Sequence, residues 1–451
     1  MAKGRGSYRL SRMNAAEQNQ QERQRELLIL CQLFYPELVS TGQTLTELAE
    51  QLTLLGVDVE VLCGPPTVLG RKERAPKRME HRGIRIRRVW GTRFPKLSLI
   101  GRVVNQVTFT ASAFLYLLLH PSKKPILVLT NPPFLAIGCA LLRCLRLGAP
   151  YVYLVFDVYP DTAIRLGVVR EGSLLARLWE RLNLMAYRHA SAIVVIGRCM
   201  EDIIDRKLVQ GGLFVNGRLQ YIPVWCDDGA IGSALRGQDP LAERFGVQGK
   251  FVVGYFGNMG RFHDMETIMG AAERLRDEQG IMFLFVGEGH KKEWAIEYAR
   301  GHSLSNCRFH GYVSREELGR LLSMADLGLV ALSEGQEGLS VPSKTFGLMA
   351  AGVPVLAVVP AACEIARIAK EENCGLWIKP GDTEELAKGI LQLRNDNGMC
   401  QIMGANGMKA IERKYSLAHV SRQYADLIAR VSAETCNGYT AAVPHTQPSE
   451  Y

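Results

Sequence analysis

One stretch of the chain combines residue types that suit the binding of a diphosphate. The apolar run Leu327–Ala331 is followed by small and acidic residues, and then by Pro342, Ser343, Lys344 and Thr345. Proline favours the first position of a helix, where backbone N–H groups have no partner within the helix and attract anions. A lysine adds a positive charge at the same point. The pattern predicts a diphosphate site at a helix N-terminus, and the alternative is an ordinary capped helix of an α/β domain.

The elements that would position this stretch follow the same plan in both halves of the chain. An apolar strand at Leu27–Leu30 leads through a glycine-containing loop to an amphipathic helix and to a strand at Val57–Leu62. The second half repeats this plan with the stretch Phe251–Gly257, a helix from about Asp264 and a strand at Ile281–Val286. Each of these is a βαβ unit. The chain therefore begins a nucleotide-binding type of fold twice.

Further apolar strands continue both halves. They are Ile126–Thr130, Tyr151–Phe156 and Ala192–Ile196 in the first half, and Leu327–Ala331, Val353–Val358 and Gly375–Ile378 in the second. Continuous apolar strands that alternate with helices are typical of parallel sheets covered on both faces. The sequence therefore predicts an α/β fold with two Rossmann-like, doubly wound domains. Because such sheets bind ligands at the carboxyl ends of their strands, we expect the active site in a cleft between the two domains.

Shifts in composition predict the domain boundaries. Polar residues without a signal-like apolar run open the chain, glycine and proline are frequent between the halves, and the last residues include proline and serine. The predicted scheme is a disordered leader at 1–26, a first domain at 27–228, a linker at 229–249, a second domain at 250–415, a C-terminal helix at 416–435 that returns towards the first domain, and a mobile tail at 436–451.

The net charge of +9, from 54 Lys and Arg against 45 Asp and Glu, is concentrated in residues 71–102. That block holds twelve basic residues and two acidic ones, which suits an anionic surface such as a bilayer or a nucleic acid. The alternative is a solvated loop and strand face. Since Trp90 and Phe94 are its aromatic residues, it has no stacking array for nucleic acid, and none is expected as a partner. Eleven cysteines without a C-x-x-C pair indicate core thiols of a reducing compartment.

Two uncharged stretches have nearly the length of a membrane-spanning helix, which needs about 20 apolar residues. Residues Val103–Leu119 include Asn105 and Gln106, and Pro125–Leu142 is interrupted by Asn131-Pro132-Pro133. We therefore expect a buried or interfacial helix in the first stretch and a strand, a turn and a helix in the second.

Short motifs occur in a fixed order along the chain. In the first half they are Tyr35-Pro36 with Gly42, Val155–Asp161, and Ala192–Ile196 with Met200. In the second half they are Gly257–Gly260, Val286–Gly289, Phe309–Val313, Ala325-Asp326 and Met349–Val355. With these motifs the chain, from about Leu27 to Ala429, resembles a family 4 retaining glycosyltransferase of the GT-B fold. The sequence Gly338–Lys344 resembles the subgroup that builds surface polysaccharides and lipid-linked glycans.

The resemblance implies transfer of a sugar from a nucleoside diphosphate sugar, here a UDP-sugar, to a hydroxyl group of a glycan, lipid-linked or small-molecule acceptor. The configuration at the anomeric carbon would be retained by a front-face substitution, in which the departing diphosphate oxygen takes the acceptor proton. Lys344, Arg261 and Asp157 occupy the positions expected to be catalytic. The expected substrate-binding positions are Gly42, Gly260, His263, Gly287, Glu288, Gly311, Tyr312, Glu337, Leu339, Ser340, Ser343 and Thr345.

The chain departs from the family pattern at two points. The two glutamates that the family often carries eight positions apart are replaced by Leu339 and Gly347, so Glu337 is the nearest candidate for a sugar-hydroxyl contact. Arg261 matches a phosphate-binding arginine, but the lysine that usually follows it has no match, which leaves His263 or Lys344 to supply charge.

No metal and no cofactor are expected. Asp157 and Asp161 are four residues apart across Tyr159 and Pro160, unlike the close D-x-D pair of metal-dependent transferases, and Asp161 is interpreted as the N-cap of a helix at 162–166. The histidines show no metal-ligand spacing.

Two other functions stay open at this stage: a sugar-nucleotide epimerase of the same fold, and a catalytically silent scaffold that binds nucleotide sugars. The expected location is cytoplasmic, with peripheral attachment to the inner face of a membrane as a further hypothesis.

Overall fold

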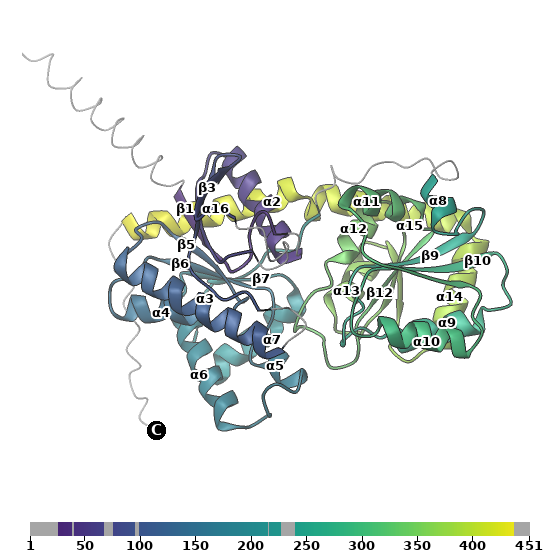
Figure 1. Cartoon of the computed structure of the whole chain (residues 1–451), viewed down its shortest axis with the longest axis horizontal. Helices are drawn as coiled ribbons and strands as arrows, with labels where there is room; N and C mark the ends of the chain where they lie inside the picture. The colour runs from purple at the N-terminus through teal and green to yellow at the C-terminus, as the bar shows by residue number, and fades with distance from the viewer. Residues whose placement is uncertain are drawn as a thin grey trace, which may run out of the picture. The chain divides into compact units, whose positions relative to one another are not determined.

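The structure is a computed structural model that describes residues 26–37, 40–66, 75–94, 99–214, 216–226 and 240–436 (Figure 1). All but the first residue of the predicted tail, most of the predicted linker and all but the last residue of the predicted leader lie outside the described residues. The described residues form two compact units. Unit 1 lies within Met1–Leu154, Met185–Ile193 and Arg422–Tyr451, and unit 2 lies within Val155–Leu184 and Val194–Ser421.

The first sheet has eight strands in the order β3-β4-β2-β1-β5-β6-β7-β8. They are β1 (Glu26–Leu30), β2 (Asp58–Cys63), β3 (Arg78–His81), β4 (Ile84–Arg88), β5 (Ile126–Leu129), β6 (Tyr151–Val155), β7 (Ala192–Val195) and β8 (Leu219–Tyr221). The helices between them are α2 (Ser40–Leu54), α3 (Leu99–Leu119), α4 (Leu135–Cys144), α5 (Asp161–Arg165), α6 (Leu174–His189) and α7 (Arg198–Gln210). Every residue of β5, β6 and β7 is buried, as expected for strands of a sheet covered on both faces.

The second sheet lies in unit 2 and has six parallel strands in the order β11-β10-β9-β12-β13-β14. They are β9 (Phe251–Phe256), β10 (Ile281–Val286), β11 (Cys307–His310), β12 (Leu327–Ala331), β13 (Val355–Val358) and β14 (Gly375–Ile378). The helices are α8 (Pro240–Arg244), α9 (Met265–Arg274), α10 (Lys292–Gly301), α11 (Arg315–Met324), α12 (Lys344–Ala350), α13 (Glu364–Glu371), α14 (Thr383–Asn395) and α15 (Asn397–Ala410). A π-helical segment, η2 (Ile411–Tyr415), and α16 (Leu417–Cys436) follow.

Strand order explains how the helices of unit 2 cover its sheet. The chain moves outwards from β9 to β11 on one side and from β12 to β14 on the other, and right-handed crossovers then place the connecting helices on opposite faces. Figure 1 shows α9 and α10 on one side of the sheet and α11 and α12 on the other. The parallel second sheet and the first sheet, in which β2, β1, β5 and β6 pair in parallel, confirm the predicted α/β fold with Rossmann-like domains.

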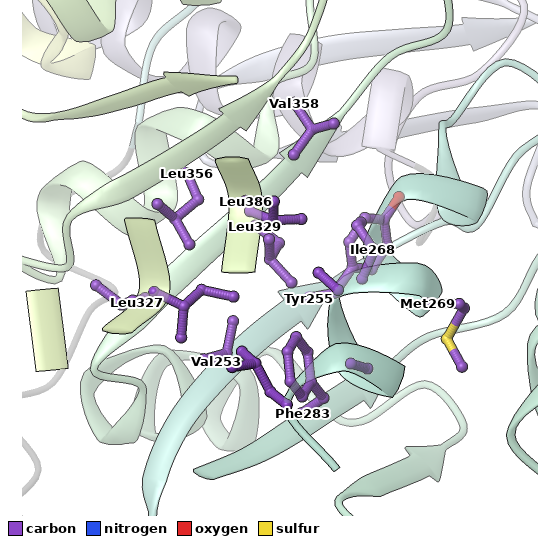
Figure 2. Packing of buried hydrophobic residues seen from close by; sticks show 14 of the residues in the cluster. Val253, Tyr255, Ile268, Met269, Phe283, Leu327, Leu329, Leu356, Val358 and Leu386 are labelled. Carbon is purple, nitrogen blue, oxygen red and sulfur yellow. The ribbon is translucent and has the colours of Figure 1, made fainter. Parts of the chain in front are cut away.

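The core of unit 2 lies between its sheet and the helices α9 and α14. Figure 2 shows Val253 and Tyr255 of β9 and Phe283 of β10 together with Leu329 of β12 and Ile268 of α9, and all five side chains are buried. Burial of each large apolar side chain contributes about 1.5–3 kcal/mol. Tyr255 differs from the others because its buried ring carries a hydroxyl group, which must find polar partners.

Helix α3 presents its apolar residues to the outside. The buried positions, Gly101, Asn105, Phe109, Ala113 and Leu117, recur every four residues. The exposed apolar positions are Ile100, Val103, Val107, Ala111, Leu115 and Leu119, with Ile100 77% and Leu119 66% exposed, and Arg102 is exposed as well. Among the described residues, Ile100–Leu119 is the one helical segment with the length and composition of a membrane span, and 22% of its apolar 18-residue stretch is buried. The second uncharged stretch forms β5 and α4, as predicted.

The basic block contains a hairpin that the sequence did not predict. Strands β3 and β4 pair antiparallel at the edge of the first sheet, and the residues of β4 alternate between buried and more exposed positions. Arg88 is buried and donates hydrogen bonds to the carbonyl oxygens of Tyr35 and Pro76, at 2.6 and 2.9 Å. Arg85 pairs with Asp58 at 2.7 Å. Part of the block therefore serves the fold of unit 1 itself.

Candidate active site

Three loops of unit 2 meet at the carboxyl ends of β9, β10 and β11. The N–H of Gly257 donates to the carbonyl oxygen of Val286 at 2.8 Å, and the N–H of Gly287 donates to that of His310 at 3.1 Å. Gly287 has a φ of +149°, and a Cβ on it would lie 2.0 Å from the carbonyl oxygen of Gly257. Only glycine permits this backbone approach. The expected substrate-binding position Gly287 is therefore required by the loop geometry itself.

Lys344 reaches these loops from the first turn of α12. Its Nζ lies 2.5 Å from the hydroxyl oxygen of Tyr255, 3.4 Å from the carbonyl oxygen of Asn258 and 3.7 Å from the centroid of the Tyr255 ring. Cations bind favourably to the face of an aromatic ring. The sheet and the helix thus hold the amino group at the end of β9, beside the Gly257 loop.

A hydrogen-bond chain fixes the orientation of Tyr255. Its hydroxyl lies 2.7 Å from Nδ1 of His263 and 2.9 Å from the carbonyl oxygen of Asn258. The N–H of Gly260 also donates to Nδ1 of His263, at 3.2 Å. Nδ1 is thus an acceptor, so the single tyrosine proton is donated to His263 or to the carbonyl oxygen of Asn258, and the tyrosine oxygen is left to accept from Lys344.

The protonation states in this group follow from burial. Burial lowers the pKa of Lys344 to about 7. Burial, together with the charge of Lys344, lowers the pKa of His263 to about 3, so this ring is neutral at pH 7. His263 was expected as a candidate for positive charge near a phosphate, and its low pKa leaves that charge to Lys344. No carboxylate forms an ion pair with Lys344 among the residues that the structure describes. An anion at this point would stabilise its protonated form.

Glu288, Gly311 and Tyr312 lie together next to these loops. A Cβ on Gly311 would lie 3.1 Å from Oε1 of Glu288, so glycine leaves room for this carboxylate. Lys292 holds the same Oε1 at 2.8 Å and also donates to the carbonyl oxygen of His310 at 3.1 Å. Tyr312 is 66% exposed, and burial and Glu288 raise the pKa of its hydroxyl. An exposed aromatic ring beside a fixed carboxylate could contact a base and a ribose.

The helix start at Ser343 differs in detail from the prediction. Ser343 is the N-cap residue of α12, with no side-chain capping bond, and Pro342 precedes it rather than standing at the first helical position. Thr345 is buried, and its hydroxyl donates to the carbonyl oxygen of Pro342 at 3.0 Å. Ser343 is exposed. Of the three residues of this turn, the structure leaves Ser343 and Lys344 accessible and uses the Thr345 hydroxyl within the turn.

The segment that carries Asp157 and Asp161 contacts the loop that precedes α12, within unit 2. The N–H of Val158 donates to the carbonyl oxygen of Leu339 at 3.1 Å, which places the neighbouring Asp157 beside this loop. Burial raises the pKa of Asp157 to about 6. The N-cap assignment of Asp161 was wrong, because Pro160 is the N-cap residue of α5 and Asp161 pairs with Lys207 at 2.8 Å.

The remaining predicted positions are more scattered. Arg261 follows Gly260 on an exposed loop and makes no hydrogen bond or ion pair within the described part of the chain. Glu337 and Ser340 lie in the same loop as Leu339, ahead of α12. Gly42 lies in unit 1, in the first turn of α2, where its carbonyl oxygen accepts a hydrogen bond from Thr46.

Tyr255 and Lys292 belong to the site but were not predicted from the sequence. Tyr255 reads as one more apolar residue of a buried strand, and its partner Lys344 lies 89 positions away. Lys292 had a detectable signal, because it stands four residues after Glu288, the spacing of an ion pair along a helix.

Both halves of the chain match families of glycosyltransferase domains. Residues 41–225 match the family described as glycosyl transferase 4-like domain, and residues 250–396 match the one described as glycosyl transferases group 1. The chain is 33% identical to the "Probable glycosyltransferase WbjE" of Pseudomonas aeruginosa over 303 residues, which cover 66% of this chain and 74% of that protein. It is 27% identical to WcaI of Escherichia coli, named for glycosyl transfer in colanic acid biosynthesis, over 80% of this chain and 89% of WcaI.

A solved structure shows the same fold. Anabaena HepE in complex with UDP superimposes with a TM-score of 0.66 at 16% identity, over 90% of this chain and 100% of that chain. This likeness shows that the chain has the GT-B fold, with two Rossmann-like domains. The chain belongs to the family 4 glycosyltransferases, as its motifs predicted, and is an enzyme that transfers a glycosyl group.

Proposed function

We propose that this enzyme transfers a sugar from a UDP-sugar to a hydroxyl group of a glycan or lipid-linked acceptor in polysaccharide biosynthesis, with retention of the anomeric configuration. The observation that carries the proposal is the amino group of Lys344, held by Tyr255 at the end of β9 beside the glycine loops and without a carboxylate partner among the described residues. A diphosphate is the ligand that such a group suits. The names of WcaI and of the HepE complex support the pathway and the nucleotide.

The proposed step breaks the bond between the anomeric carbon and the diphosphate oxygen and forms the bond to the acceptor oxygen on the same face. The acceptor proton moves to the departing diphosphate oxygen, so atoms and charge balance without a protein nucleophile. Lys344 and Arg261 would stabilise the negative charge that develops on the leaving group, since preorganised charges act most strongly where charge appears. Asp157, which is neutral below pH 6, would contact a sugar hydroxyl.

Incubation of the purified enzyme with UDP-sugars and no acceptor tests this proposal. We expect slow release of UDP and free sugar, detected by chromatography, and we expect the release to persist in excess EDTA because Arg261 and Lys344 balance the diphosphate charge. Loss of activity in EDTA that Mg²⁺ or Mn²⁺ restores would contradict the metal-independent step. Conversion to a second UDP-sugar without release would indicate an epimerase. Binding without turnover, even with a glycan acceptor supplied, would indicate a catalytically silent scaffold. The absence of the usual glutamate pair is the sequence feature that favours this alternative.

We also propose that the apolar stripe of α3, formed by Ile100, Val103, Val107, Leu115 and Leu119, docks on an anionic membrane surface that carries the acceptor. An exposed apolar helix face is favourable at a bilayer interface and unfavourable in water. Helix α3 contacts α4, whose last turn and following residues expose Leu141, Leu145 and Leu147 beside Arg146. Basic residues near an anionic leaflet contribute about 1 kcal/mol each, and salt screens them.

Vesicle sedimentation should reveal this docking. The protein is expected to pellet with phosphatidylglycerol-containing vesicles at low salt and to do so less as salt rises. Val107→Gln combined with Leu115→Gln should reduce pelleting, because both side chains lie on the exposed stripe. Arg88 is left unchanged, since it is buried and supports the fold.

The matched control for this experiment is Ile402→Gln with Met408→Gln, which removes two exposed apolar residues from α15 in unit 2. It should pellet like the wild type. Equal binding to neutral phosphatidylcholine vesicles would remove the electrostatic contribution, and no binding to either kind of vesicle would remove the membrane as a partner.

A further inference from the structure

Unit 2 contains a cavity of about 400 Å³ that is separate from the group around Lys344. Its walls are α5, α7 and the loop that follows β12, and its polar lining includes Arg165, Arg206, Lys207, Asp161, Asp202 and Glu337. The volume falls within the range of about 300–1,000 Å³ that is usual for small-molecule sites. Glu337 and Leu339 of its lining are expected substrate-binding positions, but the transfer step proposed for Lys344, Arg261 and Asp157 uses none of the lining residues.

Two glycines shape the loop that forms one wall. Gly335 has a φ of +78°, and a Cβ on it would lie 3.0 Å from the guanidinium of Arg165. Gly338 has a φ of +73°, and a Cβ on it would lie 2.6 Å from the carbonyl oxygen of Cys199 in α7. Glycine adopts this left-handed conformation without strain. The loop therefore lies against both helices, with Glu337 between the two glycines.

Glu337 has an unsatisfied carboxylate oxygen at this wall. Its Oε2 is buried and has no hydrogen-bond partner among the described residues. A buried polar atom without a partner is costly, so it is rarely left in that state when a ligand can reach it. Arg165 forms no ion pair within the described part of the chain, and Arg206 donates only to the backbone carbonyl oxygen of Asp202, at 3.0 Å. Asp161 Oδ2 likewise makes no hydrogen bond within the described residues, but Lys207 Nζ lies 2.8 Å from it as an ion-pair partner. The cavity therefore offers the carboxylate of Glu337, which has no ion-pair partner among these residues, and two guanidinium groups with donors to spare.

The charges on the lining are balanced. Three cationic side chains face three carboxylates, of which Asp161 is held by Lys207 at 2.8 Å and Asp202 by Arg367 at 3.1 Å. The carboxylates would repel a phosphate group, whereas a hydroxyl group can donate to a carboxylate and accept from a guanidinium at once. A neutral molecule with several hydroxyl groups fits this pattern best.

We propose that this cavity binds a saccharide unit of the acceptor, with Glu337 and Arg165 as its hydrogen-bonding residues. The inference rests on the proposed transferase function and adds a site for the acceptor to it. The loop that carries Glu337 continues through Leu339 to Lys344, so an occupied cavity would fix one end of the segment whose other end contacts the donor. Glu337 was expected to contact a sugar hydroxyl, and the cavity assigns that hydroxyl to the acceptor.

Saturation-transfer NMR with a panel of methyl glycosides tests this proposal on the full chain. The panel comprises the methyl glycosides of glucose, galactose, mannose, fucose and N-acetylglucosamine, each measured without UDP and with saturating UDP. At least one glycoside should bind, and its signal should persist when UDP is present. Glu337→Gln should lower the affinity for that glycoside at least about tenfold, since it removes a charge-assisted hydrogen bond. Arg165→Gln is the second variant, should Glu337→Gln fail to fold.

Glu334→Gln is the matched control, because Glu334 is an exposed carboxylate in the same loop and does not line the cavity. It should bind the glycoside like the wild type. The proposal fails if no glycoside binds, if UDP displaces the bound glycoside, if inorganic phosphate binds in its place, or if Glu337→Gln and Arg165→Gln both bind like the control. UDP titrated into the same samples should bind every variant equally. Loss of UDP binding in the wild type would instead overturn the donor assignment.

Discussion

Replacing Lys344 with alanine is expected to lower turnover by about 100-fold or more while leaving the fold intact, because it removes a preorganised charge from the leaving diphosphate. The side chain is half-buried at the end of β9, where its amino group contacts the Tyr255 hydroxyl, the carbonyl oxygen of Asn258 and the face of the Tyr255 ring. Steady-state kinetics with a UDP-sugar would measure the loss, and circular dichroism would confirm that the variant folds.

The control for this prediction is Lys250→Ala. Lys250 donates to the carbonyl oxygen of Gln279 at 2.7 Å, at the opposite, amino-terminal end of the same strand, and its loss should leave turnover unchanged. Arg261→Ala tests the arginine on the exposed loop and is also expected to lower turnover. Wild-type turnover in Lys344→Ala would contradict the assignment.

The affinity for UDP-glucose should fall as the pH rises through about 7. Burial lowers the pKa of Lys344 from 10.5 to about 7 in the free enzyme, so the ammonium form predominates below that pH and the neutral amine above it. A bound diphosphate favours the ammonium form, so donor binding takes up a proton at higher pH. The affinity should decline towards about tenfold per pH unit above 7. The diphosphate of UDP-glucose keeps its charge over this range.

Calorimetric titrations between pH 6 and pH 9 would measure this dependence. Lys344→Ala should remove it by removing the titrating group, and Lys344→Arg should also flatten it because arginine stays charged throughout. A pH-independent affinity in the wild type would show that the amino group of Lys344 does not titrate on donor binding. His263 should not contribute, since its pKa of about 3 lies below the range.

The parts of the fold that the sequence predicted best are the buried parallel strands. The observed bounds of β10 and β12 are those predicted, because both strands lie inside the sheet and consist of continuous apolar residues. The bounds of β14 also match, although β14 is the edge strand and Ile378 is its one buried residue. The hairpin of β3 and β4 was missed for the opposite reason. It lies at the edge of the sheet, and its alternating arginines read as a charged loop.

The candidate site was predicted only as far as local sequence defines it. The glycine loops and Lys344 stand in recognisable motifs, but the pairing of Lys344 with Tyr255 joins two strand-and-helix units far apart in the chain. Aspartate favours the N-cap position of a helix, but in α5 its neighbour Pro160 occupies that position. Asp161 forms an ion pair with Lys207 instead. The buried hydroxyl of Thr345 depends on packing that the motif does not encode.

The central claim is that Lys344 binds the diphosphate of the sugar donor. Calorimetric titration of UDP and of uridine into the wild type and into Lys344→Ala tests it most directly, because the two ligands differ only in the diphosphate. The wild type should bind UDP at least about tenfold more tightly than uridine, and the variant should lose most of this difference while it binds uridine as before. An unchanged UDP affinity in Lys344→Ala would contradict the claim.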